Sequence, residues 1–133
     1  LIAITSVIVM EKALALTIDY TKQRKAFGQP VFDFQNTQFK LAEMYSKARI
    51  ARTFVNDCIE KAIDGTLDGT TSAIAKLWAT DTEWEIVDQC LQLHGGYGYI
   101  NEYPIARMFR NSRISRIYGG SNEIMKMLIA RTL

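Results

Sequence analysis

The sequence predicts an all-α domain, an antiparallel up-down helical bundle with a short additional helix at its C-terminal end. Apolar residues recur at steps of three and four over long stretches, as they do along one face of a helix, and no stretch alternates as a half-buried strand does. Proline occurs only twice, and glycines stand between the periodic stretches. Three long helices on short loops pack most simply as antiparallel neighbours.

The first helix is expected to run from the start of the chain to about Phe27. Gly28 stands where a left-handed residue commonly ends a helix, and Pro30 prevents the helix from continuing. Basic residues, Arg24 among them, crowd the last turns, where cations interact favourably with the helix dipole.

The second helix is expected over residues 33–64 and the third over residues 70–94, with Gly65 and Gly95 as their stops. In each, apolar residues at steps of three and four define the face that should pack inward. On the second helix these are Leu41, Met44, Tyr45, Ala48, Ala51, Val55, Cys58, Ile59 and Ala62. On the third they are Ile74, Leu77, Trp78, Trp84, Val87, Cys90 and Leu91.

Two shorter helices should close the bundle. One begins near Asn101 with Pro104 in its first turn, where the N–H that proline lacks would have no helical partner. The other begins at Ser121 and runs to the end of the chain. The residues expected to face inward are Ile105, Met108 and Phe109 on the first and Ile124, Met127 and Leu128 on the second.

The composition excludes several classes of function. The 133 residues are expected to form one domain, residues 1–133, and a net charge of +2 gives no electrostatic basis for nucleic acid as the main partner. The apolar run at the start ends at Glu11, well short of the roughly 20 residues that a membrane span requires. The single histidine, His94, is expected to cap or support a helix. Cys58 and Cys90 are expected to be buried free thiols, and no metal site or catalytic triad is recognisable.

Two glycine pairs mark the most informative region. Gly95 and Gly96 end the third predicted helix, and Gly119 and Gly120 precede the last one. Glycine lets backbone N–H groups approach a bulky ligand, and a helix N-terminus offers unpaired donors to an anion. One pair alone could simply cap a helix, but two pairs with aromatic and basic residues between them favour a ligand site. The basic residues are Arg107, Arg110, Arg113 and Arg116, expected either on a solvated surface or in contact with a subunit interface or a phosphate-bearing ligand.

Four motifs together resemble the C-terminal domain of the acyl-CoA dehydrogenases, over essentially the whole chain. They are QRKAFG at 23–28, FQ at 34–35 with LAEM at 41–44, QLHGGYGY at 92–99 and IYGGSNEI at 117–124. The resemblance implies an FAD-dependent oxidation of an acyl-CoA to the trans-2-enoyl-CoA in fatty-acid or branched-chain acyl degradation. A glutamate would remove the α proton, and the β hydrogen would leave as hydride to the flavin. It also implies electron-transfer flavoprotein as electron acceptor, a homodimer or homotetramer, and a bacterial cytoplasmic or mitochondrial matrix location.

Carried over motif by motif, the resemblance implies three groups of binding residues. Those expected to contact the FAD of a neighbouring subunit are Arg24, Gln35, Gln92, Leu93, His94, Gly95 and Gly96. Those expected to contact FAD bound to their own subunit are Ser121, Asn122 and Glu123. Those expected to border the thioester end of the substrate are Tyr118, Gly119 and Gly120.

The sequence departs from the family pattern at Gly119. Many members carry the catalytic glutamate at this position, and glycine cannot abstract a proton. The branch that resembles long-chain and isovaleryl-CoA dehydrogenases takes its base from the first long helix instead. Matching that helix places the glutamate about three residues before Leu1, so we expect the natural polypeptide to continue upstream and no catalytic residue to lie in this chain.

Other functions remain open at this point. The chain lacks the N-terminal and middle domains of the family, so we expect it to be inactive alone and to associate with itself. An acyl-CoA oxidase or a flavin hydroxylase would use the same scaffold. A non-catalytic helical assembly or binding module would also account for the missing base, although it would not require paired glycine loops.

Overall fold

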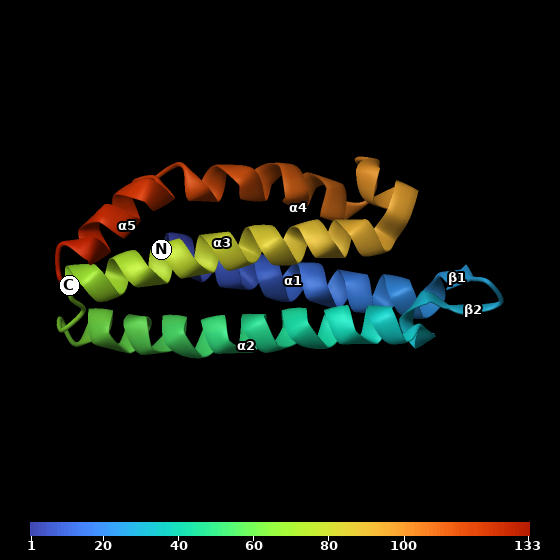
Figure 1. The fold of residues 1–133 in the computed structure, drawn as a ribbon, viewed down its shortest axis with the longest axis horizontal. Helices are drawn as coiled ribbons and strands as arrows, with labels where there is room; N and C mark the ends of the chain where they lie inside the picture. Colours follow the sequence, from blue (N-terminus) through green and yellow to red (C-terminus); the bar gives the residue numbers. More distant parts are fainter.

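The computed structural model describes residues 1–133, and it is an all-α bundle of five α-helices (Figure 1). The α-helices are α1 (Ile2–Gln23), α2 (Gln35–Ile63), α3 (Gly69–His94), α4 (Pro104–Ser112) and α5 (Asn122–Ala130). Two short strands, β1 (Lys25–Ala26) and β2 (Gln29–Pro30), and the 3₁₀ turns η1 (Val31–Asp33), η2 (Gly95–Tyr99) and η3 (Arg113–Arg116) complete the chain. The predicted fold class is confirmed, and no helix has both the length and the apolar character that crossing a membrane requires.

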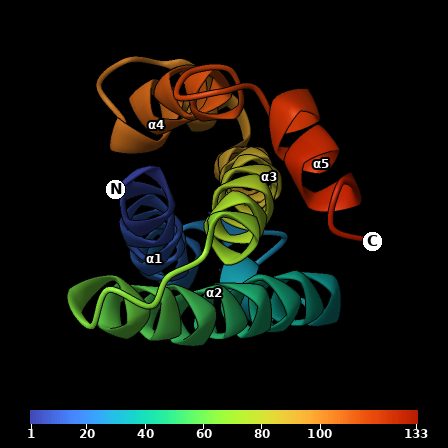
Figure 2. The same ribbon diagram turned by 90° about the vertical axis from the view of Figure 1, so that its left-hand side faces the viewer.

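Helix α3 is the centre of the molecule. It contacts α1, α2, α4 and α5, and Figure 2 shows it surrounded by them. Helices α1 and α3 form a middle layer between α2 on one side and α4 on the other. The core lies between α1, α2 and α3, with one residue from α4. Its buried members are Val7, Met10, Ala13, Leu14, Leu41, Met44, Ala48, Ala51, Val55, Ile86, Val87, Cys90 and Ile105.

The end of the first helix differs from the prediction. Helix α1 ends at Gln23, and the chain then forms a two-stranded antiparallel hairpin in which Ala26 pairs with Gln29. Phe27 and Gly28 both have positive φ, 52° and 85°, as a two-residue hairpin turn of type I′ requires. Gly28 is therefore a turn residue and not a helix cap. The Phe27 side chain is 98% exposed at the tip of the hairpin.

The second and third helices lie close to their predicted limits. Helix α3 begins after Asp68, whose side chain accepts a hydrogen bond from the N–H of Thr71 at 2.8 Å, and it ends before Gly95, which has a positive φ of 59°. On α2 the predicted inward face is confirmed except at Tyr45 and Ala62, which are exposed. Cys58 and Cys90 are buried free thiols, as predicted.

The predicted inward face of α3 is only partly correct. Val87 and Cys90 are buried, but Ile74 and Trp78 are exposed. Because α3 has neighbours on several sides, it has no single apolar stripe, and polar residues are buried wherever a neighbouring helix supplies a partner. One example is Glu83, whose Oε2 accepts a hydrogen bond of 2.6 Å from the buried hydroxyl of Ser6 on α1.

The predicted inward face is correct for α4 and wrong for α5. On α4, Ile105 is buried, and Met108 and Phe109 pack against the core as predicted. On α5, the prediction that Ile124, Met127 and Leu128 face inward is wrong, because these three side chains are 38–44% exposed. The buried residues of α5 are instead Asn122 and Met125. Helix α5 is oriented with Asn122 toward the interior because the side-chain amide of Asn122 forms hydrogen bonds with residues of α3.

Candidate functional site

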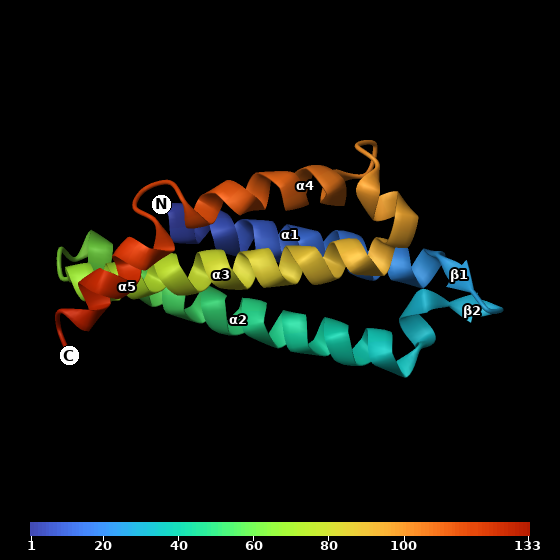
Figure 3. The same ribbon diagram turned by 45° about the horizontal axis from the view of Figure 1, so that its top comes forward.

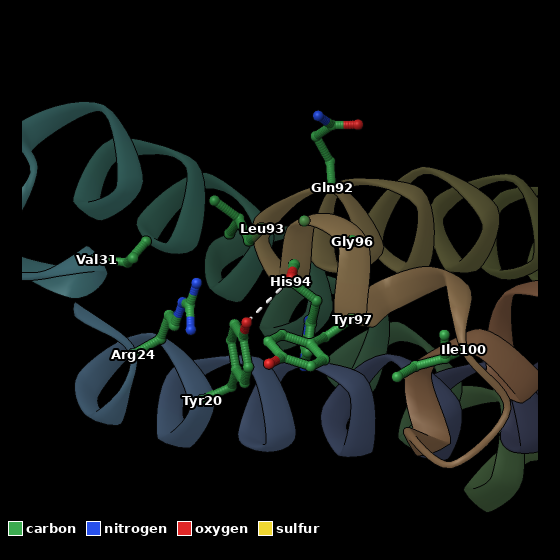
Figure 4. Close-up of a pocket in the computed structure, with 10 residues that line it drawn as sticks. Tyr20, Arg24, Val31, Gln92, Leu93, His94, Gly96, Tyr97 and Ile100 are labelled. Atoms are coloured by element: carbon green, nitrogen blue, oxygen red, sulfur yellow. Dashed lines mark hydrogen bonds between the residues drawn. The ribbon is translucent and has the colours of Figure 1, made fainter. Parts of the chain in front are cut away.

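A pocket of about 480 Å³ lies at the hairpin end of the bundle, where α1, η1 and the end of α3 meet (Figure 4). The pocket brings Arg24 together with Gln92, Leu93, His94 and the Gly95–Gly96 pair, six of the seven residues expected to contact the FAD of a neighbouring subunit. The other lining residues are Tyr20, Val31, Tyr97 and Ile100. Gln35, at the first turn of α2, is exposed and does not line the pocket.

Glycines shape the wall that follows α3. Gly95 adopts a positive φ and ends the helix, so the chain turns sharply into η2. Gly98 is buried against α3, where a Cβ carbon would lie 2.6 Å from the carbonyl oxygen of Leu91. Only glycine therefore lets η2 pack this closely on α3. The Gly95–Gly96 backbone itself has open space around both Cα atoms, because a Cβ carbon there would meet no other atom within 4 Å.

Aromatic rings form the floor of the pocket. The rings of Tyr20 and His94 stack with centroids 4.2 Å apart, and the Tyr20 hydroxyl donates a hydrogen bond of 3.1 Å to the carbonyl oxygen of His94. Tyr103 packs edge-on against Tyr20, and Tyr97 lies against Tyr103. The dashed line in Figure 4 marks the hydrogen bond from Tyr20 to His94. Tyr20, His94 and Tyr97 thus present a platform of aromatic rings to the pocket, with Tyr103 packed behind them, and an aromatic ligand can stack on such rings.

Burial controls the ionisation of this platform. His94 is 5% exposed, and burial lowers its pKa, although the hydrogen-bonding contact of Nδ1 with the carbonyl oxygen of Cys90, at 2.8 Å, opposes this. Burial also raises the pKa of Tyr20. Both groups are therefore neutral near pH 7, and His94 supports the pocket, as the prediction of a structural histidine states.

Arg24 is the only permanently charged side chain that lines the pocket. It has no carboxylate within salt-bridge distance, and its guanidinium lies 5.5 Å from the centre of the Tyr97 ring. A cation over an aromatic platform, beside exposed glycine backbone, is suited to an anionic ligand that carries an aromatic ring. In Figure 4 the Gln92 side chain points away from Arg24.

The predicted site residues 118–123 lie at the opposite end of the bundle, next to the N-terminus of α1 (Figure 3). Gly119 and Gly120 have positive φ values of 64° and 88°. Their N–H groups donate to no backbone carbonyl, so two adjacent donors are free. Gly119 and Ile2 line a second, mostly apolar cavity of about 610 Å³ between α1, α2, α3 and α5.

The three predicted site residues at the start of α5, Ser121, Asn122 and Glu123, have different environments. The Ser121 hydroxyl caps the helix by accepting from the N–H of Ile124 at 3.5 Å. Glu123 is exposed, and hydrogen bonds from its own backbone N–H and from Ser121 lower its pKa. Asn122 is different, because its side chain is 1% exposed and hydrogen-bonded within the chain.

The four arginines between the glycine loops do not form one site. Arg107 donates to the backbone carbonyl of Asn101, and Arg116 forms an ion pair with Asp81, with N and O 2.6 Å apart. Arg113 lies over the Trp84 ring at 6.0 Å. Arg110 lies beside Phe109 in a shallow pocket on α4.

Sequence reasoning missed several residues of the first pocket, above all Tyr20 and Tyr97. A signal for Tyr20 was present, because it stands four residues before Arg24 and so shares its helix face. Val31 and Ile100 carried no such signal, because turns place them.

Comparison with known proteins identifies the family of the chain. The family model described as acyl-CoA dehydrogenase, C-terminal domain, matches residues 1–133. The chain belongs to the acyl-CoA dehydrogenase family. Among family members, the mitochondrial long-chain specific acyl-CoA dehydrogenase of Rattus norvegicus is 45% identical over 117 residues, which are 88% of this chain and 27% of that protein. The corresponding protein of Sus scrofa is 44% identical over 133 residues, which are 100% of this chain and 31% of its own.

Solved structures of the family share the fold. The acyl-CoA dehydrogenase from Geobacillus kaustophilus superposes with a TM-score of 0.97 at 44% identity, over 98% of this chain and 34% of that one. The butyryl-CoA dehydrogenase from Megasphaera elsdenii gives 0.95 at 37% identity, over 98% and 34%. The chain thus spans about a third of the length of the relatives that it matches.

Proposed function

We propose that this chain is the C-terminal domain of a longer FAD-dependent acyl-CoA dehydrogenase that converts an acyl-CoA to the trans-2-enoyl-CoA. The observation that carries the proposal is the meeting of Arg24 with the Gly95–Gly96 loop in one pocket. Arg24 precedes α2 in the sequence, and the glycine pair follows α3. The fold therefore brings together groups that are far apart in the sequence.

The first pocket fits the phosphate-bearing part of FAD. Arg24 has no acidic partner and is free to pair with a diphosphate, and the Gly95–Gly96 backbone has no side chain that would obstruct it. When bound, FAD would supply the hydride acceptor. Arg24 would hold the diphosphate, and Tyr97 would offer a ring face to the adenine. Gln92, at the edge of the pocket, and Gln35, outside it, would contact the same neighbouring subunit's FAD.

The loop before α5 is proposed to receive the thioester. The free N–H groups of Gly119 and Gly120 can donate to a carbonyl oxygen and so make the α proton more acidic. Ser121 and Glu123 would meet the cofactor bound to their own subunit from the helix that follows. Tyr118, which is half exposed, would border the substrate.

The catalytic base is proposed to lie upstream on the helix that α1 continues. Gly119 has no side chain, and it lies directly beside Ile2 in the first turn of α1. A glutamate about three residues before Leu1 would therefore lie one turn away from the loop that binds the thioester. Such a carboxylate could take the α proton.

Assembly and location follow from the same proposal. Apolar side chains are exposed on α2, at Phe39, Tyr45 and Ile50, and on α3, at Ile74 and Trp78, and a homodimer or homotetramer would bury them. One chain of this fold, at 34% identity, comes from a structure of the electron transferring flavoprotein of Acidaminococcus fermentans, which supports a partner of that kind. Mitochondrial and bacterial relatives support a mitochondrial matrix or bacterial cytoplasmic location.

The decisive experiment compares this chain with the longer protein. We expect only the longer protein to carry flavin and to reduce a dye in the presence of acyl-CoA, and a change of its upstream glutamate to glutamine should abolish the activity but leave the flavin spectrum intact. Activity of the 133-residue chain alone would contradict the proposal. So would a longer protein that binds flavin but oxidises no acyl-CoA, which would direct the search to relatives such as the 3-(aryl)acrylate reductase of Clostridium sporogenes, 38% identical over 125 residues.

A further inference from the structure

One carboxylate oxygen on α3 holds both ends of the loop that carries Gly119 and Gly120. Arg116, just before the loop, has its Nε 2.6 Å from Asp81 Oδ1. Asn122, just after it, donates a hydrogen bond of 2.9 Å from Nδ2 to the same oxygen. The two residues that flank the loop 117–121 therefore contact the same oxygen of Asp81.

The glycine part of the loop has no backbone hydrogen bonds of its own, although the N–H groups of Ile117 and Tyr118 donate to the carbonyl oxygen of Ile114. Gly119 and Gly120 make no backbone hydrogen bond through their N–H groups, and both have positive φ. Glycine gives the unfolded and alternative states of a segment many conformations, so the segment is ordered only if its ends are fixed. The far attachment is firm, because Asn122 is buried and its Oδ1 accepts a hydrogen bond of 2.6 Å from the buried Lys76.

The two attachments differ in what they contribute. Asp81 and Arg116 have side chains that are 39% and 34% exposed, and ion pairs in such positions add little to stability. The Asn122 network is buried, so breaking it removes a satisfied hydrogen-bond partner from the interior. Loss of the Asp81 carboxylate should therefore release the Arg116 side of the loop without unfolding the bundle, while Lys76 and Thr80 still hold Asn122.

We propose that Asp81 is a positioning residue that acts through Arg116 and Asn122 to set the place of the Gly119–Gly120 backbone. This inference rests on the proposed function for its catalytic consequence, because that function puts the thioester carbonyl at this backbone. Asp81 itself touches neither substrate nor cofactor in the proposal. Its carboxylate fixes the direction of the free N–H groups, and small displacements of such donors weaken transition-state stabilisation.

The test uses the longer protein with Asp81→Ala and Asp81→Asn. The matched control is Glu85→Gln, one turn further along α3, which removes an exposed ion pair with Lys47 that has no connection to the loop. Two quantities are measured: hydrogen exchange of the Ile117 and Tyr118 amides, which donate to the carbonyl oxygen of Ile114, and the separate kcat and KM for an acyl-CoA.

We expect Asp81→Ala to raise the exchange of the Ile117 and Tyr118 amides about tenfold, because the opening that breaks their hydrogen bonds to Ile114 no longer has to break the contacts of Asp81 as well. The kcat should fall about 10- to 100-fold with a smaller change in KM and an unchanged flavin content. Asp81→Asn keeps an oxygen that can accept from Asn122, so its effects should be smaller in both measurements. If Asp81→Ala does not fold, the isosteric Asp81→Asn decides.

The outcomes separate the two proposals. Exchange and kcat that match those of the Glu85→Gln control would overturn the role of Asp81. Raised exchange with an unchanged kcat would show that Asp81 holds the loop but would overturn its role in positioning the Gly119–Gly120 backbone for catalysis. Raised exchange in a protein whose unmodified form oxidises no acyl-CoA would leave the attachment in place and overturn the proposed function.

Discussion

Ile2 and Gly119 are in such close contact that a Cβ carbon on Gly119 would lie 2.3 Å from Cδ1 of Ile2. The start of α1 thus occupies the space into which a side chain at position 119 would project. The positive φ of Gly119, 64°, favours glycine there, and the contact with the flexible end of the Ile2 side chain adds a smaller cost, which gives the first prediction.

Gly119→Ala should destabilise the fold by about 1–3 kcal/mol, because alanine is strained at a positive φ and meets Ile2. Gly65→Ala is the matched control, since Gly65 also has a positive φ but nothing within 4 Å of its Cβ position. The difference between the two variants in denaturant unfolding reports the contact. Ile2→Ala combined with Gly119→Ala should recover that difference, and a strictly additive double mutant would contradict the prediction.

Arg24→Gln should weaken FAD binding by the longer protein about 10- to 100-fold, because it removes one charge-assisted hydrogen bond to the diphosphate. Lys25→Gln changes the same charge at the next residue, which does not line the pocket, and should leave the affinity unchanged. Titration of the flavin-free protein with FAD, followed by fluorescence, measures both. Equal losses in the two variants would show that the net charge matters and the position of Arg24 does not.

Stability should fall as the pH drops below about 6.5, the ordinary pKa of histidine. Because burial lowers the pKa of His94 in the folded state, the unfolded state binds the proton more readily, and this contribution is complete above pH 6.5 and lost in acid. The slope due to one group is at most about 1.4 kcal/mol per pH unit. We expect His94→Gln to flatten the free energy of unfolding between pH 5 and 7.

The matched control for that titration is Tyr20→Phe. It removes the hydrogen bond to the His94 carbonyl but keeps a ring to stack on the imidazole. Its stability should be lower at every pH, with the slope retained. If His94→Gln leaves the slope as steep as in the unmodified chain, the acid effect belongs to carboxylates instead.

The two thiols should react at different rates with a disulfide reagent. Burial raises the pKa of Cys90 to about 11, and Cys90 is fully buried, so we expect it to react only when the chain unfolds. Cys58 lines the apolar cavity and should react faster, although burial raises its pKa as well. Cys58→Ala and Cys90→Ala isolate each thiol, and fast labelling of Cys90 in native buffer would contradict the prediction.

Periodicity predicted the helices well but their faces unevenly. On α2 the apolar spacing identified the buried face because α2 packs on one side only. On α3 and α5 it failed where a polar residue is buried with a partner, as Lys76 and Asn122 are with each other. Spacing cannot reveal such a pair, because each residue looks solvent-exposed until the other is placed. The β1–β2 hairpin was missed because strands of two residues carry no alternation.

The candidate site could be predicted by motif but not by geometry. Arg24, His94 and the Gly95–Gly96 pair were expected together, and the fold brings them together. Their aromatic floor was not expected, since Tyr20, Tyr97 and Tyr103 come from three separate elements. Asn122 was expected to contact a cofactor, a role that stays a prediction, and nothing in its motif indicated the buried hydrogen bonds to α3.

The central place of α3 has a consequence for biosynthesis. A nascent chain leaves the ribosome from its N-terminus, so within this domain α1 and α2 emerge before α3, the helix that contacts both of them. Ser6 on α1 must wait for the synthesis of 77 further residues before Glu83 can accept its hydrogen bond. The core of this domain therefore closes only after most of α3 has been synthesised.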